Sequence, residues 1–570
     1  MLKNFFKKHG WRYIPGVLLL VICAYIQTLS PLALGKAIEL AAFSKWQEFF
    51  PVAMSVFYIA LGVFATRFGW RWFLIRTSRE MEVYLRDQLY SHLMQLPIGF
   101  FGKNRSGNLM AYAINDVNAV RMMFGMVIAQ VVNSLSSVMF SLGKMTASIH
   151  LRLSLYSLLP IPFAAVAIFL LGRKIQSRAR YAQEMFSKLS GHVQENINGM
   201  RVLKAFAQEA DQYAEYEAES MEKLRANEKW YFTNGLIDPI IKIMFGLSYS
   251  IALIYGGKLV LTGEISLSDY VAFNSYLTMI VFPVIAIGRI NNNLQRGLAS
   301  YKRLNEIMSE AEVPEFDQTP SRIPVGEGIS ANHLSFRYEG AETNALEDIS
   351  FHLRPGGMLG IVGPTGGGKS TILSLIIKLL PCPSDSLFVG ERDICEIPAV
   401  TLRSHIGFVP QDGFLFDESI LDNVRFFSDA SDEEVLQALD DAGMTKDISE
   451  MPDGVQTLCG ERGNHLSGGQ RQRVSLARAL VRKPKFLLLD DTLSAVDAAT
   501  EEMILRSLKT RLRGATSVVV AHRLSAVRHA DEILYVENGA ITERGTHEEL
   551  LQLGGGYYRM HQLQSRKGDA

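Results

Sequence analysis

The sequence predicts two domains of different chemistry, a membrane-embedded all-α region of six helices followed by an α/β domain. Up to about residue 300 the chain contains six apolar stretches, and from residue 329 short β-branched runs alternate with helical stretches. A segment rich in proline and glycine separates the two parts. With 570 residues, 48% of them hydrophobic, the chain is too long for one compact core and more apolar than a soluble protein requires.

Each apolar stretch approaches the roughly 20 residues that a helix needs to cross a bilayer. The stretches are residues 14–34, 50–75, 123–149, 153–172, 236–261 and 270–288. Core helices of soluble proteins are shorter and keep a polar face, so length and composition favour membrane spans. The first stretch continues to about Gly35 without a small-residue cleavage site, which favours a retained helix over a secretory signal.

Basic residues predict the orientation of the spans, because short cytoplasmic loops are enriched in Lys and Arg. The segments after the second and fourth stretches are rich in both, whereas the opposite loops hold only Lys36, Lys45, Arg152 and Lys258. We therefore expect a multi-pass protein of the cell membrane with both termini in the cytoplasm. The two basic segments keep helical periodicity, and an extension of about 25 residues would carry each helix roughly 35 to 40 Å into the cytoplasm.

We expect a transmembrane domain over residues 1–308, a linker over 309–328 and an α/β domain over 329–570. The linker contains Pro314, Pro320 and Pro324 and lacks a sustained apolar period. Acidic and basic residues balance at 58 each, which argues against a nucleic-acid-binding surface. The four cysteines lack metal-ligand spacing, and we expect neither a disulfide nor a zinc site from them.

The strongest chemical signal is a glycine-rich loop between a predicted strand at residues 358–362 and a predicted helix at 371–380. Glycines let the backbone wrap around phosphate oxygens, and the helix N-terminus adds partial positive charge. We expect Lys369 to reach the β- and γ-phosphates of ATP and Ser370 to ligate Mg²⁺. The predicted nucleotide-binding residues here are Gly363, Pro364, Thr365, Gly366, Gly367, Gly368, Lys369, Ser370 and Thr371.

A second Mg²⁺ ligand is predicted at Asp490, which ends the aliphatic run 486–489. An acid at the end of a hydrophobic strand holds the metal ion in proteins with such a phosphate loop. Aliphatic strands that end in Asp are common in α/β cores, so this assignment depends on the glycine-rich loop before it.

Between the loop and the acidic strand lies Leu466-Ser467-Gly468-Gly469-Gln470. With this signature in this order, the chain resembles the ABC ATPase family, and the α/β domain resembles its P-loop nucleotide-binding domain. The resemblance implies that Ser467, Gly468, Gly469 and Gln470 cap the γ-phosphate of an ATP held by the other subunit. The physical basis is again a helix N-terminus and backbone donors that meet an anion.

Further positions resemble family motifs one by one. Tyr338 corresponds to the aromatic residue that stacks on adenine. Gln411 corresponds to the loop glutamine that contacts Mg²⁺ and couples to the membrane domain, and His522 to the switch histidine near the γ-phosphate. Asp497 ends a segment, 494–497, that resembles the loop crossing the dimer interface.

The membrane half resembles exporters of this family, of the multidrug or lipid type, so the resemblance covers nearly the whole chain. Residues 100–117 resemble the first coupling loop, residues 198–209 the second, and residues 460–463 an exporter-type segment that contacts these loops. We expect polar residues within the spans to face either a cavity or another helix, and snorkelling of Lys144 and Lys242 toward a headgroup layer is a further alternative. They are Gln130, Asn133, Lys144, Lys242 and Asn274.

One position departs from the family pattern. Competent members place a Glu after the Mg²⁺-binding Asp, where it polarises the attacking water, whereas this chain has Asp491. Losing one methylene retracts the carboxylate by more than about 1 Å, and such a displacement can cost on the order of 100-fold in rate. The chain in this respect resembles the degenerate-site subunit of heterodimeric bacterial exporters, although the retained His522 leaves a slow homodimer open.

The sequence thus predicts ATP-driven export of a hydrophobic or amphipathic drug, lipid or peptide by one half of a dimeric ABC transporter. The expected cofactors are ATP and Mg²⁺, and the expected partners are a second half-transporter, favoured as a different chain, the bilayer and the substrate, but no nucleic acid. Alternatives on the same frame are a homodimeric lipid flippase or exporter and an ATP-gated channel or regulator. A DNA-acting ABC ATPase would share the cytosolic motifs, but six spans exclude it.

Overall fold

A computed structural model describes residues 2–311, 328–492, 498–511 and 514–568. Most of the predicted linker at 309–328 therefore lies outside the described residues. The chain divides into two compact units, and each is considered by itself. The membrane unit comprises Met1–Met94 and Arg105–Glu310, and the cytosolic unit comprises Gln95–Asn104 and Ala311–Ala570.

Six helical segments among the described residues of the membrane unit are long and apolar enough to cross a bilayer. They are Leu2–Ala42, Trp46–Leu93, Ser106–Ile149, Leu151–Asn198, Glu209–Leu261 and Leu267–Met308. Each contains one of the six predicted stretches. The segments run well past the apolar stretches, as expected for helices that continue beyond the bilayer.

These segments are built from shorter helices joined by kinks and turns. The elements are α1 (Leu2–His9), η1 (Gly10–Arg12), α2 (Tyr13–Gln27), α3 (Ser30–Ala42), α4 (Trp46–Leu93), α6 (Ser106–Ala111), η2 (Tyr112–Asp116), α7 (Val117–Met122), η3 (Met123–Val127), α8 (Ile128–Gly143), η4 (Lys144–Ile149), α9 (Leu151–Leu158), α10 (Pro160–Asn198), α11 (Met200–Phe206), α12 (Glu209–Gly235), α13 (Ile237–Ile251), η5 (Ala252–Gly256), α14 (Gly257–Leu261) and α15 (Leu267–Met308).

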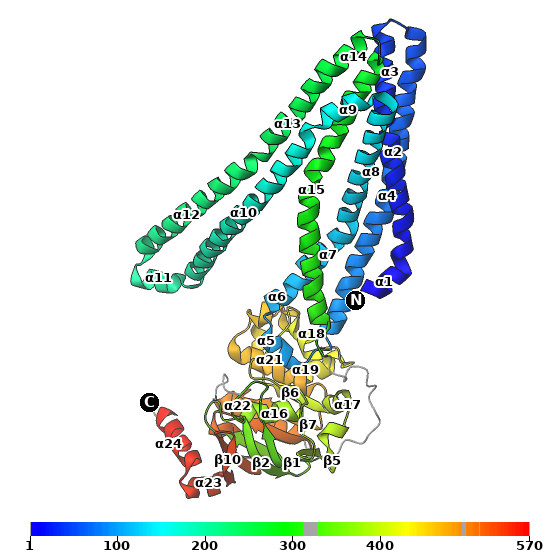
Figure 1. The fold of residues 1–570 in the computed structure, drawn as a ribbon. Coiled ribbons are helices and arrows are strands. Elements are labelled where there is room, and N and C mark those ends of the chain that lie inside the picture. The colour runs from blue at the N-terminus through cyan, green and yellow to red at the C-terminus, as the bar shows by residue number, and fades with distance from the viewer. Residues whose placement is uncertain (1, 312–327, 493–497, 512–513, 569–570) are drawn as a thin grey trace. The chain divides into compact units, whose positions relative to one another are not determined.

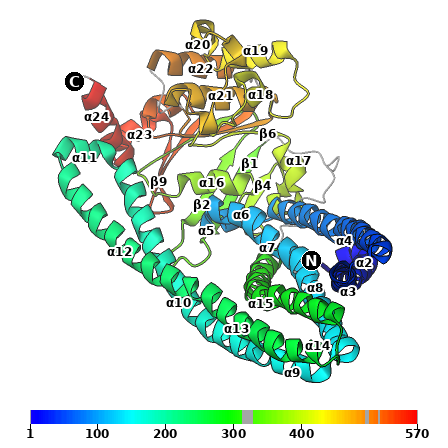
Figure 2. The same ribbon diagram turned by 90° about the horizontal axis from the view of Figure 1, so that it is seen from above.

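The helices of the membrane unit form two groups. In the first group α2 packs against α4 and α8, and α15 packs against α3 and α8. In the second, α10 packs mainly against α12 and α13, which follow each other in one long segment. Helix α10 and this segment diverge from the first group (Figures 1 and 2). Helix α11 closes the end of the diverging pair.

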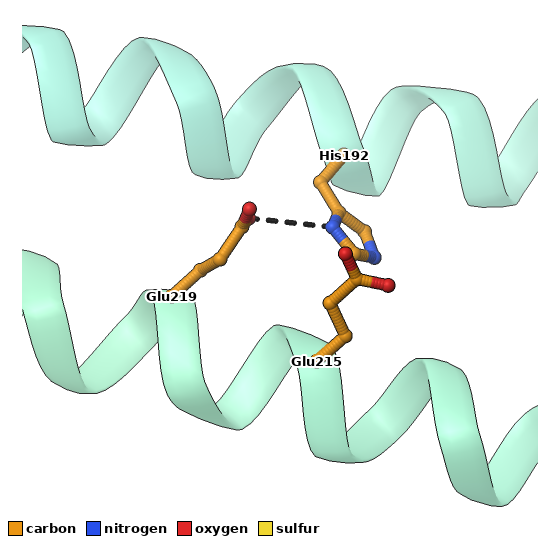
Figure 3. A group of neighbouring side chains, drawn as sticks. All are labelled: His192, Glu215 and Glu219. Atoms are coloured by element: carbon orange, nitrogen blue, oxygen red, sulfur yellow. Dashed lines mark ion pairs between the residues drawn. The ribbon is translucent and has the colours of Figure 1, made fainter.

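A cluster of charged side chains joins α10 to α12 (Figure 3). Glu219 Oε1 lies 3.2 Å from Lys188 Nζ, and Glu219 Oε2 lies 3.3 Å from His192 Nδ1. Gln212 Oε1 lies 3.1 Å from His192 Nε2. Glu215 completes the group. The positive charge of Lys188 compensates Glu219, so the cluster ties the two long helices together.

The cytosolic unit contains two sheets. The strands are β1 (Ile329–Phe336), β2 (Leu346–Leu353), β3 (Met358–Val362), β4 (Leu387–Val389), β5 (Arg392–Asp393), β6 (Ile406–Val409), β7 (Phe486–Asp490), β8 (Thr516–Val520), β9 (Glu532–Glu537) and β10 (Ala540–Gly545). One sheet is antiparallel, in the order β2-β1-β4-β5. The other has the order β10-β9-β3-β8-β7-β6 and is parallel except for β10.

Helices surround these sheets. They are α5 (Ile98–Lys103), α16 (Lys369–Ile376), η6 (Ile394–Glu396), α17 (Ala399–Arg403), α18 (Ile420–Arg425), α19 (Asp432–Asp441), α20 (Thr445–Glu450), η7 (Gly454–Gln456), η8 (Glu461–Gly463), α21 (Gly468–Leu480), α22 (Ala498–Arg511), η9 (Leu524–Val527), α23 (His547–Leu553) and α24 (Gly556–Gly568).

Both faces of the six-stranded sheet are buried. Successive residues of a strand point to opposite faces. In β7, Leu487 and Leu489 accordingly join the apolar cluster that includes α21, whereas Phe486 and Leu488 join the cluster that includes α16. A sheet covered on both sides reads as a continuous hydrophobic run, which explains the composition of residues 486–489.

The buried carboxylate of Asp116 yields a prediction about stability. Asp116 accepts hydrogen bonds from Ser300 Oγ (2.7 Å) and Arg303 Nε (3.1 Å) and thereby joins η2 to α15. Asp116→Ala should destabilise the protein by about 2 kcal/mol, because Arg303 and Ser300 lose their acceptor. The thermal midpoint in detergent measures this. The control is Lys302→Ala, whose exposed pair with Glu306 should contribute under about 0.5 kcal/mol; equal losses would contradict the prediction.

Candidate functional site

Four neighbouring strands of the six-stranded sheet end at one edge, and a predicted site residue follows or ends each of them. Strands β3, β8, β7 and β6 are adjacent and parallel. The phosphate loop follows β3, His522 follows β8, Asp490 ends β7, and Gln411 follows β6. Because parallel strands point the same way, the structure places these groups along one edge of the sheet.

The glycines of the phosphate loop are required by its backbone. Gly363, Gly366 and Gly368 have φ angles of +145°, +82° and +96°. These angles lie in a region that other residues rarely adopt. A Cβ at Gly363 would also lie 2.0 Å from the carbonyl oxygen of Val536. The loop therefore approaches its neighbours, and any ligand, with bare backbone.

Lys369 is the first residue of α16, which begins two residues earlier than predicted and ends at Ile376 rather than at 380. Its buried ammonium group donates to the carbonyl oxygens of Gly363 (2.9 Å) and Pro364 (2.8 Å). Burial lowers the pKa of Lys369, and the nearby carboxylates of Asp491 and Asp490 oppose this shift. The ammonium group of Lys369 is thus held inside the loop. Because α16 also begins here, the positive charge and the helix N-terminus together favour binding of an anion.

Ser370 and Asp490 form the pair predicted to hold Mg²⁺. Ser370 Oγ donates to Asp490 Oδ1 at 2.9 Å. Burial raises the pKa of Asp490, the charge of Asp491 adds to this rise, and the hydrogen bond from Ser370 opposes it. A hydroxyl and a carboxylate are oxygen ligands of the kind that Mg²⁺ prefers, and two adjacent acids favour a divalent cation. These residues therefore fit the metal ion.

Asp491 is held against the end of β8. Its backbone N–H donates to Val520 O (2.9 Å), and its Oδ1 accepts from the backbone N–H of His522 (3.2 Å). Its φ angle of +46° is left-handed, a conformation that Asp adopts more readily than most residues. The short side chain therefore turns to the loop that carries His522.

Two residues near His522 in the structure were not predicted from the sequence. Gln564 of α24 donates from Nε2 to His522 O (2.7 Å) and accepts from Leu524 N–H (3.0 Å). Glu501 of α22 is 2% exposed and accepts from Ser525 Oγ at 2.7 Å. Neither belongs to a motif, and both lie more than 20 residues from His522 in the sequence, so only the folded chain brings them together.

The signature residues open α21. Ser467 is the N-cap, its Oγ accepts from Gln470 N–H (3.3 Å), and Gln470 Oε1 accepts from Ser467 N–H (2.9 Å). This reciprocal pair is a capping box. Gln470 Nε2 also donates to Asp447 (2.8 Å), to which Arg473 donates as well. Burial raises the pKa of Asp447, but the hydrogen bonds from Gln470 and Arg473 outweigh it and lower the pKa overall.

The other predicted residues have simpler surroundings. Tyr338 follows β1, is 44% exposed, and its hydroxyl lies 3.1 Å from Thr371 Oγ1, so an exposed aromatic ring stands beside the phosphate loop. Gln411 is exposed. Asp497 and the segment 494–497 lie outside the described residues.

The membrane unit contains a cavity of about 660 Å³ between α2, α4, α8 and α15. Of the polar residues proposed for a pathway, Gln130 and Asn133 line it. Asn274 instead donates to Tyr270 O (3.1 Å), and Lys242 pairs with Asp238 (2.7 Å). Lys144 starts η4 and is not a lining residue. Two of the five polar residues therefore line this cavity, and the other three do not.

Comparison with known proteins identifies the family. Residues 13–284 match the ABC transporter transmembrane region, and residues 346–494 match the ABC transporter domain. The probable multidrug resistance ABC transporter ATP-binding/permease protein YheI of Bacillus subtilis is 38% identical over 98% of this chain and 96% of its own length. The multidrug resistance-like ATP-binding protein MdlA of Escherichia coli is 35% identical over 99% and 97%. The chain therefore belongs to the ABC transporter family.

One further relative and one solved structure extend the comparison. The ATP-dependent lipid A-core flippase of Syntrophus aciditrophicus is 31% identical over 85% of this chain and 80% of its own length. A solved structure of a bacterial Atm1-family ABC exporter with ATP bound matches with a TM-score of 0.78, at 24% identity, over 98% of this chain and 99% of that chain. The predicted fold class, six membrane helices followed by an α/β nucleotide-binding domain, is thereby confirmed.

The protein is an ABC exporter half-transporter, a multi-pass membrane protein with a cytoplasmic ATP-binding domain. Its ATPase activity is coupled to transport across the membrane. The family assignment confirms the predicted ATP binding.

Lys369 provides a first test of the site. Lys369→Met should weaken ATP binding by about 100-fold, because the loop loses the charge that is predicted to meet the β- and γ-phosphates. Equilibrium binding of a fluorescent ATP analogue measures this. Lys446→Met removes an exposed lysine of α20 in the same unit and should leave the affinity unchanged. Equal affinities of the Lys369→Met and wild-type proteins would disprove the assignment.

The raised pKa of Asp490 predicts a pH dependence of Mg²⁺ binding. Because Mg²⁺ competes with the proton, its affinity should fall as the pH drops, up to about tenfold per unit below that pKa. The fall should begin at a higher pH than for an ordinary Asp. Mg²⁺ titrations of the ATP-bound protein from pH 8 to pH 5 test this. In Asp490→Asn only the titration of the nucleotide should remain; an identical profile would contradict the role of Asp490.

Proposed function

We propose that this chain is one subunit of a heterodimeric exporter with one weak and one competent ATP site, and that it moves hydrophobic or amphipathic molecules across the cytoplasmic membrane. The observation that carries the proposal is Asp491, which stands where an active subunit needs Glu. Relatives named for multidrug resistance and for lipid A-core flipping support this substrate range.

The weak site follows from the reach of Asp491. Its carboxylate is one methylene shorter than that of Glu and already accepts the backbone N–H of His522. It therefore stands farther from a water aligned with the γ-phosphate, and poor alignment at a reacting centre is costly. Nucleotide binding does not depend on this carboxylate, so the site still closes around ATP.

The remaining site residues keep the roles that their positions favour. Residues 363–371 enclose the phosphates, with Lys369 as the charged contact. Ser370, Gln411 and Asp490 hold Mg²⁺, which when bound neutralises phosphate charge. Tyr338 stacks on adenine, and His522 contacts the γ-phosphate.

The signature of this chain serves the other site. Its helix N-terminus is fully formed, because Ser467 and Gln470 cap each other. Gly468 and Gly469 leave the backbone donors there uncovered, which favours contact with the γ-phosphate of the partner's nucleotide. Asp497 is assigned to the same interface. This chain combines an intact signature with an ATP site that Asp491 makes weak. That combination is expected of a chain whose signature completes a competent ATP site on a different subunit.

A homodimeric exporter with slow turnover is the second candidate. The retained His522 favours it, because a subunit that never needed to hydrolyse ATP would gain nothing from this residue. The two candidates differ in what a restored Glu would do.

Asp491→Glu in the transporter purified with its native partners separates them. In a heterodimer this change adds a second competent site, and ATPase turnover should rise about twofold. In a homodimer it repairs every site, and turnover should rise far more, up to the order of 100-fold. Asp412→Glu, an acid of the glutamine loop lengthened by the same methylene, is the matched control. Unchanged turnover after Asp491→Glu would remove the support for a weak site.

A further inference from the structure

Three side chains that can serve as metal ligands meet between α10 and α12 (Figure 3). Glu215 and Glu219 are four residues apart on α12, so both side chains leave the same face of that helix. His192 lies opposite them on α10, which packs along α12. One ligand atom of each of the three side chains lies within 4.8 Å of the other two. The group therefore combines an imidazole nitrogen with two carboxylates.

The charges of this group are not balanced. Lys188 Nζ lies 3.2 Å from Glu219 Oε1 and supplies one positive charge. Glu215 makes no hydrogen bond or ion pair with the described residues, so its charge has no partner among them. When His192 is neutral, two carboxylates and one ammonium group leave one negative charge, and two carboxylates this close repel each other. A cation between the carboxylates would remove this repulsion.

Glu219 also has an unsatisfied oxygen. Its Oε2 is buried and accepts no hydrogen bond from the described residues. It lies 3.3 Å from His192 Nδ1, close enough for an ion pair but without the alignment of a hydrogen bond. Two ligands held about 2.1 Å from a tetrahedral metal ion stand roughly 3.4 Å apart, so this separation suits a shared ion. A buried acceptor without a partner is costly, and a metal ion would satisfy it.

The ring of His192 is held in a way that suits a metal ligand. Gln212 Oε1 lies 3.1 Å from Nε2, the ring nitrogen that does not face Glu219. A metal-bound histidine commonly donates its other ring N–H to an oxygen, which fixes the orientation of the ring. Glu215 is exposed, so its side chain is free to rotate toward an ion that enters from solvent.

We propose that His192, Glu215 and Glu219 bind a divalent transition-metal ion of the Zn²⁺ type, which cross-links α10 to α12. Nitrogen and carboxylate ligands together suit Zn²⁺, whereas Mg²⁺ and Ca²⁺ prefer sites made of oxygen alone. Three protein ligands leave the fourth position to water. Lys188 stays on Glu219 Oε1, and its positive charge opposes that of the ion. The site is separate from the ATP site and does not depend on the proposed export function.

Binding is measured on the tag-free, full-length transporter purified with its native partners, stripped of metal and free of ATP. Zn²⁺ is titrated in competition with a fluorescent Zn²⁺ indicator, which leaves out weak binding by other histidines and cysteines. Wild type should bind one tight equivalent per copy of this chain more than His192→Ala does. An excess of Ca²⁺ or Mg²⁺ should not displace it. Zn²⁺ should also raise the thermal midpoint of wild type but not that of His192→Ala, because an ion bound to the folded state stabilises it.

Further variants assign the ion to this group. Glu215→Gln and Glu219→Gln should each weaken Zn²⁺ binding by about 100-fold, and Gln212→Ala by about tenfold, because Gln212 only orients the ring. Lys188→Gln should tighten binding by about fivefold, because a positive charge beside the ion is lost. The matched control is Glu217→Gln, an exposed acid of α12 outside the group, which should bind as wild type does. Elution of each variant as an assembled transporter in size-exclusion chromatography verifies its fold.

Equal numbers of tight Zn²⁺ equivalents in wild type, His192→Ala and Glu215→Gln would overturn the inference. The group would then be an ion-pair network, in which Glu219 is shared by Lys188 and a protonated His192. Equal losses in Glu215→Gln and Glu217→Gln would overturn it as well, because the exposed acids of α12 would then attract the ion only by their general negative charge.

Discussion

The parallel pairing of β3, β8, β7 and β6 is the constraint on which the nucleotide site depends. It brings the ends of four strands to one edge, although residues 363 and 522 are far apart in the chain. Burial of both faces fixes these strands, because a displaced strand would lose its close packing against the apolar clusters on both sides of the sheet. The phosphate loop, the acid pair and His522 can therefore keep their mutual positions without direct bonds among all of them.

The acid pair at the end of β7 places two negative charges beside one buried lysine. Burial raises the pKa of Asp490 and lowers that of Lys369, so each group disfavours its charged form without ligands. A nucleotide with a divalent cation supplies the missing charges of both signs. Asp491, the second acid of the pair, is also buried, and its carboxylate accepts a hydrogen bond from the backbone N–H of His522.

In the membrane unit the arrangement of charge is different. Asp116 and Arg303 compensate each other, and Lys188 compensates Glu219 between α10 and α12. Arg67 and Arg289 have no acid within ion-pair distance among the described residues, and they line a cavity with both polar and apolar residues.

The sequence by itself determined the six membrane helices, the α/β class and the phosphate-loop residues, because length, apolar content and glycine spacing are local properties of the chain. It also located Asp491 as a departure, since the motif is contiguous. It missed Gln564 and Glu501, and it could not separate Gln130 and Asn133 from Lys144, Lys242 and Asn274. Only the tertiary structure decided these, because a hydrogen bond to His522 from another helix, or a place on a cavity wall, depends on which distant segments pack together.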